Sequence, residues 1–359
     1  MMKAIGKSQP IRTKSTVFFT PHSFFAAFQP KSTKAKIIQV PKSEPSDNEV
    51  LVKVKFSALD TGLDDVINKT FTGGFIHKTS TDPLLCAWHY SGIVQRVGPN
   101  VTNFTVGDAV FGHLQYAPET TQGSAAEYIV VKAEDTAHKP RLVNFSTAAA
   151  ATTEGLTALQ SIRDEGGLKV PGSENGGKSQ EQQTILINGA GGQVGALAVQ
   201  WAKQLMGAHV TAVCSTKDVD RVKNQLGADV VIDRKVSPNY WESFQNEQFD
   251  LIFDTPNALK YSKLFRCVKP HGAIVATLPS WGLLWGMVYS LFTKGKQMKM
   301  IGVQAKQADL KLLGEYLEQG KLTVNIDSTY DVRDIEQATE RNRDPSKKGR
   351  VVIQVENGW

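Results

Sequence analysis

Hydrophobic residues in the middle of the chain recur with two different periods. Two short β-type runs are predicted at residues 184–188 and 209–214. Between them, apolar residues follow the three- and four-residue spacing of one helix face, at Val194, Leu197, Ala198, Trp201 and Leu205. A strand followed by one helix and a second strand forms a βαβ unit, so these two strands are expected to be parallel.

The same alternation continues towards the carboxyl end. The pattern predicts helices at residues 219–226 and 258–268, and strands at residues 230–233, 249–254 and 273–278. Such alternation builds a doubly wound α/β sheet, in which a ligand lies at the carboxyl ends of the strands. The predicted strand ends carry Ser215, Arg234, Asn257 and Leu278.

Shorter strands are predicted ahead of this region. Residues 36–40, 50–56 and 123–132 have strand patterns, residues 92–112 form short strands joined by glycine turns, and residues 2–8 can form a first strand. This order indicates a small β-barrel-like domain before the α/β domain. Beyond the α/β region, a helix at residues 311–319 and a closing strand at residues 350–355 are expected.

The composition is that of an ordinary globular protein. With 359 residues, 41% of them hydrophobic, the chain is long enough for two domains. Its net charge of +6 is spread among 35 acidic residues, and no basic run alternates with aromatics, so nucleic-acid binding is not expected. Cys86, Cys214 and Cys267 lie far apart, which favours a reducing compartment over a disulfide framework.

The first 43 residues contain eight Lys or Arg and no Asp or Glu. This composition is typical of organelle transit peptides, but only one of the eight is Arg. We therefore expect a cytoplasmic protein, with an organelle as the alternative.

Residues 278–292 form the most hydrophobic run, LPSWGLLWGMVYSLF. The run is too short to span a bilayer comfortably and contains glycines, so no transmembrane span is expected. A buried helix, a dimer interface or an apolar wall for a lipophilic substrate is favoured, and a surface membrane contact is the alternative.

A glycine-rich turn joins the strand at 184–188 to the helix that follows it. Glycines at 189, 192 and 195 offer a tight bend, a close backbone approach and a small helix–strand contact. Such a turn presents backbone N–H groups to a pyrophosphate at a helix N-terminus. The predicted cofactor-binding residues of the turn are Gly189, Gly191, Gly192, Gln193, Val194 and Gly195.

The end of the second strand indicates which dinucleotide is bound. An NAD site usually has Asp or Glu here, whereas an NADP site replaces the carboxylate with cations. The chain has Cys214, Ser215 and Thr216, then Lys217 and Arg221. We therefore predict NADPH over NADH, although both cations can also be solvated helix charges.

Two other motif matches lack the structural context that they need. Residues 172–179 fit the P-loop pattern of an NTPase, but they do not follow a strand and open a helix, so a surface loop is preferred. Tyr128 and Lys132 fit the Y-x-x-x-K pattern of short-chain reductases, but their segment has a strand pattern, so we regard the match as accidental.

Several longer segments resemble one known family over nearly the whole chain. They are GIVQRVGPNVTNFTVGDAVFG, LINGAGGQVGALAVQWAKQLMGAHVTAVCS, LGADVVID and FDLIFDTPN. They look like the medium-chain dehydrogenase/reductase superfamily, and more narrowly its zinc-independent quinone oxidoreductase branch. The resemblance implies a GroES-like β domain at residues 1–145, completed by 305–359, and a Rossmann domain at 146–304.

The resemblance also implies a function. Members of this branch use NADPH to reduce quinones or the activated double bond of enones, so the expected partners are a small lipophilic carbonyl or quinone and a second copy in a homodimer. Thr157 matches a position near the nicotinamide. Arg234 stands where related reductases often carry a Tyr near the adenosine, and this difference can change contacts there.

No metal is expected in the site. In zinc members of the family, a Cys and a His occupy the positions of Asp60 and Trp88, and a lobe of four close cysteines is present. This chain lacks all of these ligands, and Cys86 with His89 supplies only half of a tetrahedral site.

Without a metal, the charge that develops on the substrate oxygen needs donors from the protein. Asp60 stands where many relatives carry an Asn donor, so it is either protonated or has another role. Tyr116 is the second catalytic candidate. The alternative is a catalytically silent nucleotide-binding or interaction protein of the same fold.

Overall fold

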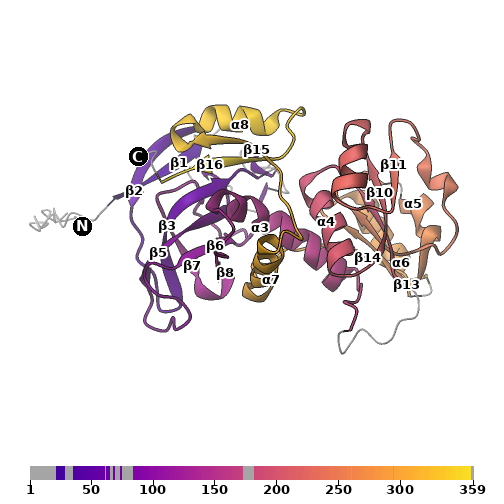
Figure 1. Cartoon of the computed structure of the whole chain (residues 1–359), viewed down its shortest axis with the longest axis horizontal. Coiled ribbons are helices and arrows are strands. Elements are labelled where there is room, and N and C mark those ends of the chain that lie inside the picture. The colour runs from indigo at the N-terminus through magenta and orange to yellow at the C-terminus, as the bar shows by residue number, and fades with distance from the viewer. Residues whose placement is uncertain are drawn as a thin grey trace, which may run out of the picture.

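The computed structural model describes residues 22–28, 35–60, 62–64, 68, 73–74, 84–172, 182–259, 261–293 and 295–356. The strand predicted at residues 2–8 and most of the P-loop-like stretch at 172–179 lie outside the described residues. Two large sheets, placed side by side and joined through helices, form most of the molecule, and the described residues also form a smaller three-stranded sheet (Figure 1).

The six-stranded sheet is parallel throughout and has the order β11-β10-β9-β12-β13-β14. Its strands are β9 (Thr184–Asn188), β10 (His209–Cys214), β11 (Val230–Asp233), β12 (Phe249–Asp254), β13 (Val268–Ala276) and β14 (Gln297–Met300). The order reverses between β9 and β12, and at such a switch point the strand ends open a crevice for a ligand. The predicted doubly wound sheet is confirmed.

The seven-stranded sheet has the order β15-β16-β3-β5-β6-β8, with β7 paired to β3. Its strands are β3 (Glu49–Ala58), β5 (His89–Val97), β6 (Ala109–His113), β7 (Tyr128–Lys132), β8 (Thr136–His138), β15 (Ile326–Asp331) and β16 (Arg350–Gln354). A smaller sheet joins β1 (His22–Phe28), β2 (Ala35–Pro41) and β4 (Leu84–Leu85). Near the carboxyl end of the chain, β16 pairs with β3, so the last strands join the sheet formed by the first part of the chain. The expected GroES-like architecture is confirmed.

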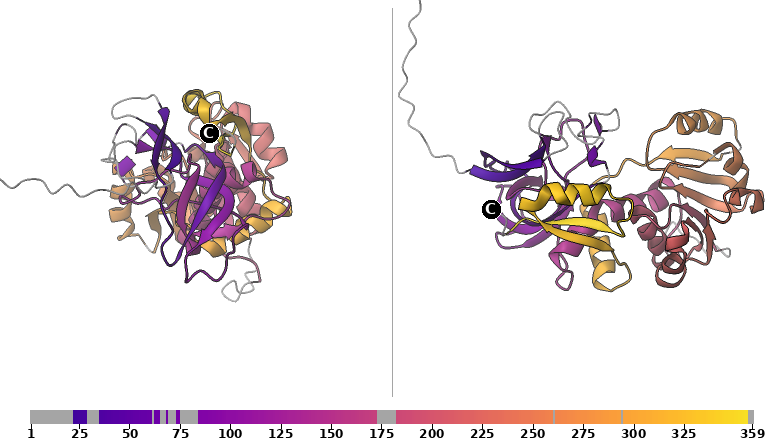
Figure 2. Two further views of the ribbon diagram at one scale, coloured as in Figure 1. Left: turned by 90° about the vertical axis from the view of Figure 1, so that its left-hand side faces the viewer. Right: turned by 90° about the horizontal axis from the view of Figure 1, so that it is seen from above.

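The helices connect and cover these sheets. They are α3 (Phe145–Gln160), α4 (Gln193–Gln204), α5 (Tyr261–Leu264), α6 (Trp281–Ser290), α7 (Gln307–Glu318) and α8 (Ile335–Arg343). Single π-helical turns lie at Ser161–Glu165 and Arg221–Gln225. Short 3₁₀ turns lie at Ala133–Asp135, Thr216–Asp218, Tyr240–Ser243, Phe265–Cys267 and Val332–Asp334. Helix α8 lies over β15 and β16 (Figure 2).

Helix α3 is the link between the two sheets. It contacts β5 and β6 on one side and α4 on the other, and small residues such as Ala148 and Ala151 let the neighbouring elements approach closely. The Asn144 side chain caps its first turn by accepting from the Thr147 backbone N–H at 2.7 Å. Trp201 of α4 donates to the Gly155 carbonyl of α3 at 3.0 Å. The two parts of the molecule therefore share a packed core.

Some predicted elements differ from those observed. The helix expected at 258–268 is only the single turn α5 and a 3₁₀ turn, because Asn257 takes a positive φ of 50° and the Asp254 carboxylate accepts from the Leu259 N–H. The strand expected at 273–278 begins earlier, at Val268, and β7 covers only the second half of 123–132. The apolar run at 278–292 forms α6, but the helix is largely exposed, so a buried helix was wrong.

Candidate nucleotide site and active site

The glycine turn between β9 and α4 has no room for a side chain at Gly189 or Gly195. Gly189 has a φ of +82°, and a Cβ there would lie 2.3 Å from Oγ1 of Thr255. A Cβ on Gly195 would lie 2.2 Å from the Gly189 carbonyl oxygen, so the first turn of α4 packs directly on the end of β9. These two positions need glycine for a left-handed backbone and for close packing.

Helix α4 begins immediately after this turn without a side-chain cap. Its N-cap is Gly192, in an extended conformation with φ −79° and ψ 175°. The first N–H groups of a helix have no partner within the helix, and the helix dipole adds positive potential at the same end. The start of α4, at Gln193 and Val194, is therefore arranged to bind an anion such as a phosphate.

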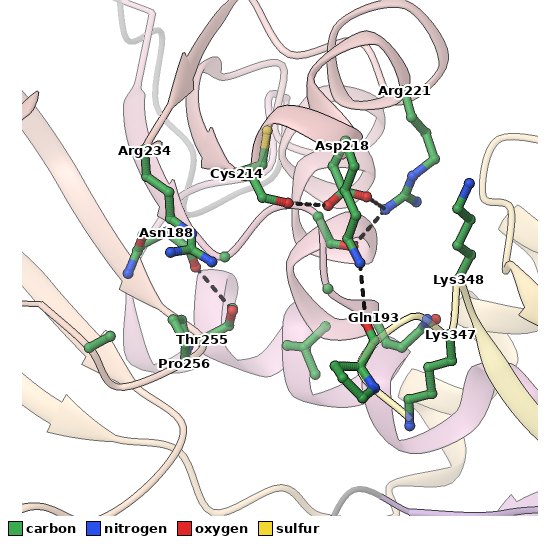
Figure 3. A pocket seen from close by; sticks show the side chains of 18 of the residues that line it. Asn188, Gln193, Cys214, Asp218, Arg221, Arg234, Thr255, Pro256, Lys347 and Lys348 are labelled. Atoms are coloured by element: carbon green, nitrogen blue, oxygen red, sulfur yellow. Dashed lines mark hydrogen bonds and ion pairs between the residues drawn. The ribbon is translucent and has the colours of Figure 1, made fainter. Parts of the chain in front are cut away.

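A cavity of 1140 Å³ opens in front of the turn. Eight of the predicted cofactor residues line it: Gly189, Gly191, Gly192, Gln193, Val194, Ser215, Lys217 and Arg234. Its opposite wall is formed by the carboxyl-terminal segment, including Asn342, Lys347 and Lys348 (Figure 3). The cavity thus lies between the switch point of the six-stranded sheet and the returning chain end.

The other predicted cofactor residues are not among the residues that line this cavity. Thr157 is buried within α3, and Gly195 lies behind the glycine turn. Asn257 donates to the Pro279 carbonyl at 3.4 Å and lines a different groove, beside α6. Leu278 is exposed at the surface.

Positive charge predominates around the cavity. Its lining contains six cations, Lys217, Arg221, Arg234, Arg343, Lys347 and Lys348, against four carboxylates, Glu154, Asp218, Asp220 and Asp344, an excess of two. Within the described part of the chain, no ion pair involves Lys217, Arg234 or Lys348. Their charges remain available for a ligand, and Figure 3 shows Arg234 and Lys348 on opposite sides of the opening.

One carboxylate near the end of β10 was missed by the sequence reasoning. Asp218 accepts from the Ser215 hydroxyl at 2.8 Å, pairs with Arg221 at 3.4 Å, and lies 2.5 Å from where a Gly191 Cβ would be. Arg221 also donates to the Gly191 carbonyl at 2.6 Å. Because Asp218 lies four residues after the end of β10 at Cys214, the sequence rule for the strand end did not include it.

The sequence reasoning also missed the cavity's far wall. Its residues include Glu154 of α3, Asn342 and Arg343 at the end of α8, and Lys347 and Lys348 between α8 and β16. The adjacent lysines just before the closing strand were a usable signal. Burial first, and then Arg350, lower the pKa of the Lys347 ammonium, whose Nζ lies 2.6 Å from both the carbonyl and side-chain oxygens of Asn342.

The two catalytic candidates contact each other. The Tyr116 hydroxyl donates to Oδ2 of Asp60, and Nε2 of His89 lies 3.3 Å from the same oxygen. The Asp60 backbone carbonyl accepts from the Asn342 side chain at 2.9 Å, which connects this cluster to the wall of the cavity. The sequence indicated Asp60 and Tyr116 separately, but not that His89 joins them.

The charge states of this cluster follow from its surroundings. Burial alone raises the pKa of Asp60, but His89, Arg350 and the Tyr116 hydroxyl together hold that pKa below its ordinary value. Burial and the Asp60 charge raise the pKa of Tyr116. Asp60 is therefore ionised and Tyr116 keeps its proton.

Cys86 and His89, the two residues with ligand-like spacing, have surroundings that do not favour a metal. Nδ1 of His89 lies 3.1 Å from the Thr152 hydroxyl and 2.9 Å from that of Thr153, so its ring is held by alcohols. Burial raises the pKa of the Cys86 thiol, which disfavours the thiolate that a metal needs. Among the described residues, no group of three or more His, Cys, Asp or Glu could hold a metal ion.

Comparisons with known proteins agree with this architecture. Residues 46–141 match the model of the alcohol dehydrogenase GroES-like domain, and residues 226–353 match that of the zinc-binding dehydrogenase family. A chloroplast envelope quinone oxidoreductase homolog of Arabidopsis thaliana is 30% identical over 88% of this chain and 93% of its own. A mitochondrial NAD(P)H oxidoreductase of Danio rerio is 28% identical, over 86% and 84%.

A solved structure shows the same fold. The quinone oxidoreductase from Coxiella burnetii superimposes with a TM-score of 0.79 at 24% sequence identity, and the match covers 93% of this chain and all of the other. The chain therefore belongs to the medium-chain dehydrogenase/reductase superfamily, in its quinone oxidoreductase branch.

Proposed function

We propose that the protein is an NADPH-dependent oxidoreductase that reduces a quinone or the C=C bond of an α,β-unsaturated carbonyl, without a metal. The observation that supports this most is the uncapped start of α4, which faces a cavity lined in part by Lys217, Arg234 and Lys348, three cations that form no ion pair with the described residues. The related proteins named quinone oxidoreductase and NAD(P)H oxidoreductase support the same reaction class. A quinone and an enone are both conjugated carbonyl acceptors, so one site can serve either.

The cofactor would bind along the strand ends of the six-stranded sheet. Gly191, Gly192 and the first N–H groups of α4 would hold the diphosphate. Lys217 and Arg234 would hold the 2′-phosphate that distinguishes NADPH from NADH. The Asp218 carboxylate nearby disfavours an extra phosphate, but its pairing with Arg221 balances that charge.

The chemistry divides between the bound cofactor and the chain. When bound, NADPH supplies a hydride from its nicotinamide ring. The negative charge that then develops on the substrate oxygen needs a preorganised donor. Tyr116 keeps its proton, which it donates to the ionised Asp60 in this structure. With substrate bound, the hydroxyl would turn away from Asp60 and donate this one proton to the substrate oxygen. Asp60, which is itself held by His89, keeps the hydroxyl at the site until then. Tyr116 is thus the proposed donor and Asp60 its positioning residue.

The test is turnover by the purified protein. NADPH absorbance should decline with phenanthrenequinone or with members of a panel of enones, and a chelator should leave the rate unchanged. Tyr116→Phe should lower kcat by about tenfold to a thousandfold while NADPH affinity stays the same. Binding of NADPH without turnover on any acceptor would support a catalytically silent nucleotide-binding protein instead. Loss of activity with the chelator would show that the reaction depends on a metal.

Two further expectations belong to the same proposal. A homodimer is expected from the resemblance, and light scattering on the purified chain measures it directly. A cytoplasmic location, with an organelle as the alternative, is tested by imaging the tagged full-length chain.

A further inference from the structure

Helix α6 presents a continuous apolar patch at the surface. We define the α6 patch as Leu278, Trp281, Leu284, Trp285, Met287, Val288, Tyr289, Leu291 and Phe292, all of which are exposed. Trp281, Trp285 and Phe292 expose 80%, 72% and 82% of their surface, and within the helix only Leu283 is buried. Figure 1 places α6 in the part of the molecule built on the six-stranded sheet, away from β3 and β15.

The packing of α6 leaves its two Trp side chains facing outward, whereas the Tyr289 ring lies edge-on to the Phe265 ring. A Cβ on Gly286 would lie 2.0 Å from the Met298 sulfur, and one on Gly282 would lie 3.5 Å from the Tyr261 ring. The small residues therefore face the protein. Trp281, Trp285 and Tyr289 follow one another at four-residue intervals and form a stripe along one helix face.

Four aromatic and five aliphatic side chains are exposed at and next to α6, which is unusual for an ordinary solvent-exposed surface. Contiguous exposed apolar patches usually mark a binding surface for a protein or a membrane. Trp and Tyr prefer the membrane–water interface, where an apolar ring and a polar group are both satisfied. At 10 residues, α6 is roughly 15 Å long, half of a bilayer core. No helix in the described ranges is long and apolar enough to cross a membrane.

The charge of the surrounding sequence identifies the partner. From residue 255 to residue 308 the chain has no Asp or Glu but eight cations: Lys260, Lys263, Arg266, Lys269, Lys294, Lys296, Lys299 and Lys306. The formal charge of this segment is +8. Because the net charge of the whole chain is +6, the remaining residues together carry a charge of −2. A second copy docked through the same patch would bring two positive segments together, whereas an anionic lipid surface attracts one.

The cations of this segment differ in how they are neutralised. Lys269, Lys296, Lys299 and Lys306 pair with acids from outside the segment, which are Asp250, Glu247, Glu165 and Asp164. Lys263 and Arg266 are exposed next to α6 and form no ion pair with the described residues. The Arg266 guanidinium donates to the Phe244 and Trp241 carbonyls and to the Asn246 side chain, which hold it in place but leave its charge unneutralised. Lys260 and Lys294 lie outside the described residues.

We propose that the α6 patch docks the protein on the surface of a bilayer that contains anionic phospholipids. The aromatic stripe enters the interfacial region, and Lys263 and Arg266 contact the headgroups. The helix lies on the membrane and does not cross it.

Vesicle flotation tests this docking with the full chain. The protein should float with vesicles of phosphatidylcholine and phosphatidylglycerol, and much less with phosphatidylcholine alone. Replacing both Trp281 and Trp285 by Ser should weaken binding roughly tenfold or more. Leu142→Ser is the matched control, because Leu142 is 79% exposed but lies far from α6 in sequence, and it should bind like the parent protein.

Two further measurements make the outcome decisive. Circular dichroism and NADPH affinity should be unchanged in the double variant, which separates loss of docking from unfolding and from any failure of the proposed function. The proposal is overturned if the parent protein does not float, if the double variant floats equally well, or if light scattering shows a dimer that the double variant dissociates while neither binds vesicles.

Discussion

Glu154 of α3 and Arg350 of β16 form an ion pair that is almost completely buried, with side-chain exposures of 8% and 2%. The second Glu154 oxygen, and Nε and one terminal nitrogen of Arg350, have no hydrogen-bond partner among the described residues. The pair joins the helix that links the two sheets to the closing strand of the chain. Its location suggests that it fixes the returning carboxyl end against the cavity, whose wall includes Glu154.

Removing one partner of this pair should destabilise the protein strongly. Arg350→Met leaves the Glu154 charge buried without a counterion, which costs about 3–5 kcal/mol. The double variant Glu154→Gln with Arg350→Met should lose less than the single variant, because no buried charge remains. Thermal and denaturant unfolding of the parent protein and of these two variants measures this, and a double variant that is less stable than Arg350→Met would contradict the explanation.

Gly189 and Gly195 should not accept a side chain. Alanine at either position would meet backbone or Thr255 atoms at 2.2–2.3 Å, and at Gly189 it would also have to adopt a left-handed backbone. We expect Gly189→Ala and Gly195→Ala to weaken NADPH binding more than about tenfold, or about 1.4 kcal/mol. Calorimetric titration measures the affinity.

Gly302→Ala is the matched control for these variants. Nothing lies within 4 Å of the added Cβ, and the residue is not among those with positive φ. It should bind NADPH like the parent protein. If Gly302→Ala fails as badly, or if Gly189→Ala binds normally, the assigned role of the glycine turn is wrong.

The parallel strands were the most predictable part of the fold. The bounds of β9, β10, β11 and β12 agree with the sequence pattern. The strands β9, β10 and β12 are largely buried, and such strands appear as short continuous apolar runs, whereas β11 lies at the sheet edge and is partly exposed. Exposure was less predictable. Residues 281–290 are apolar on every side, so periodicity could not show that α6 would turn its Trp residues to solvent.

The site was predictable only where one segment builds it. The glycine turn and Lys217 belong to a local motif, and the sequence identified them. His89 and Asp60 are 29 residues apart, and the wall that contains Lys347 comes from the far end of the chain. Such contacts form because the carboxyl-terminal strands β15 and β16 join the seven-stranded sheet. A local sequence pattern cannot predict this long-range pairing.

Cofactor choice should depend on Lys217 and Arg234. If they hold the 2′-phosphate, Lys217→Ala and Arg234→Ala should each weaken NADPH binding by about tenfold, or about 1.4 kcal/mol, and NADH binding by less than about twofold. Lys311→Ala, an exposed cation on α7, is the control and should change neither affinity. If the substitutions weaken NADPH binding and NADH binding equally, the two residues do not contact the 2′-phosphate.

Stability should depend on pH through His113, which is buried and donates from Nδ1 to the Leu114 carbonyl at 2.9 Å. Burial lowers the pKa of His113 to about 4, from an ordinary value of 6.5. Below pH 6.5 the unfolded chain therefore binds a proton that the folded chain does not. This contribution to stability is complete above pH 6.5 and is lost as the pH falls towards 4, by roughly 3 kcal/mol in total.

Urea unfolding between pH 7.5 and pH 4.5 measures this dependence. His113→Gln cannot titrate, so its free energy of unfolding should decline less over that interval than that of the parent protein. His138→Gln is the control, because the His138 side chain is 52% exposed, and it should keep the parental dependence. Carboxylates with lowered pKa values, such as Asp60, lose their contribution only below their ordinary pKa of 3.8, outside this window. If the free energy of unfolding of His113→Gln declines with pH as steeply as that of the parent protein, another buried group takes up the proton.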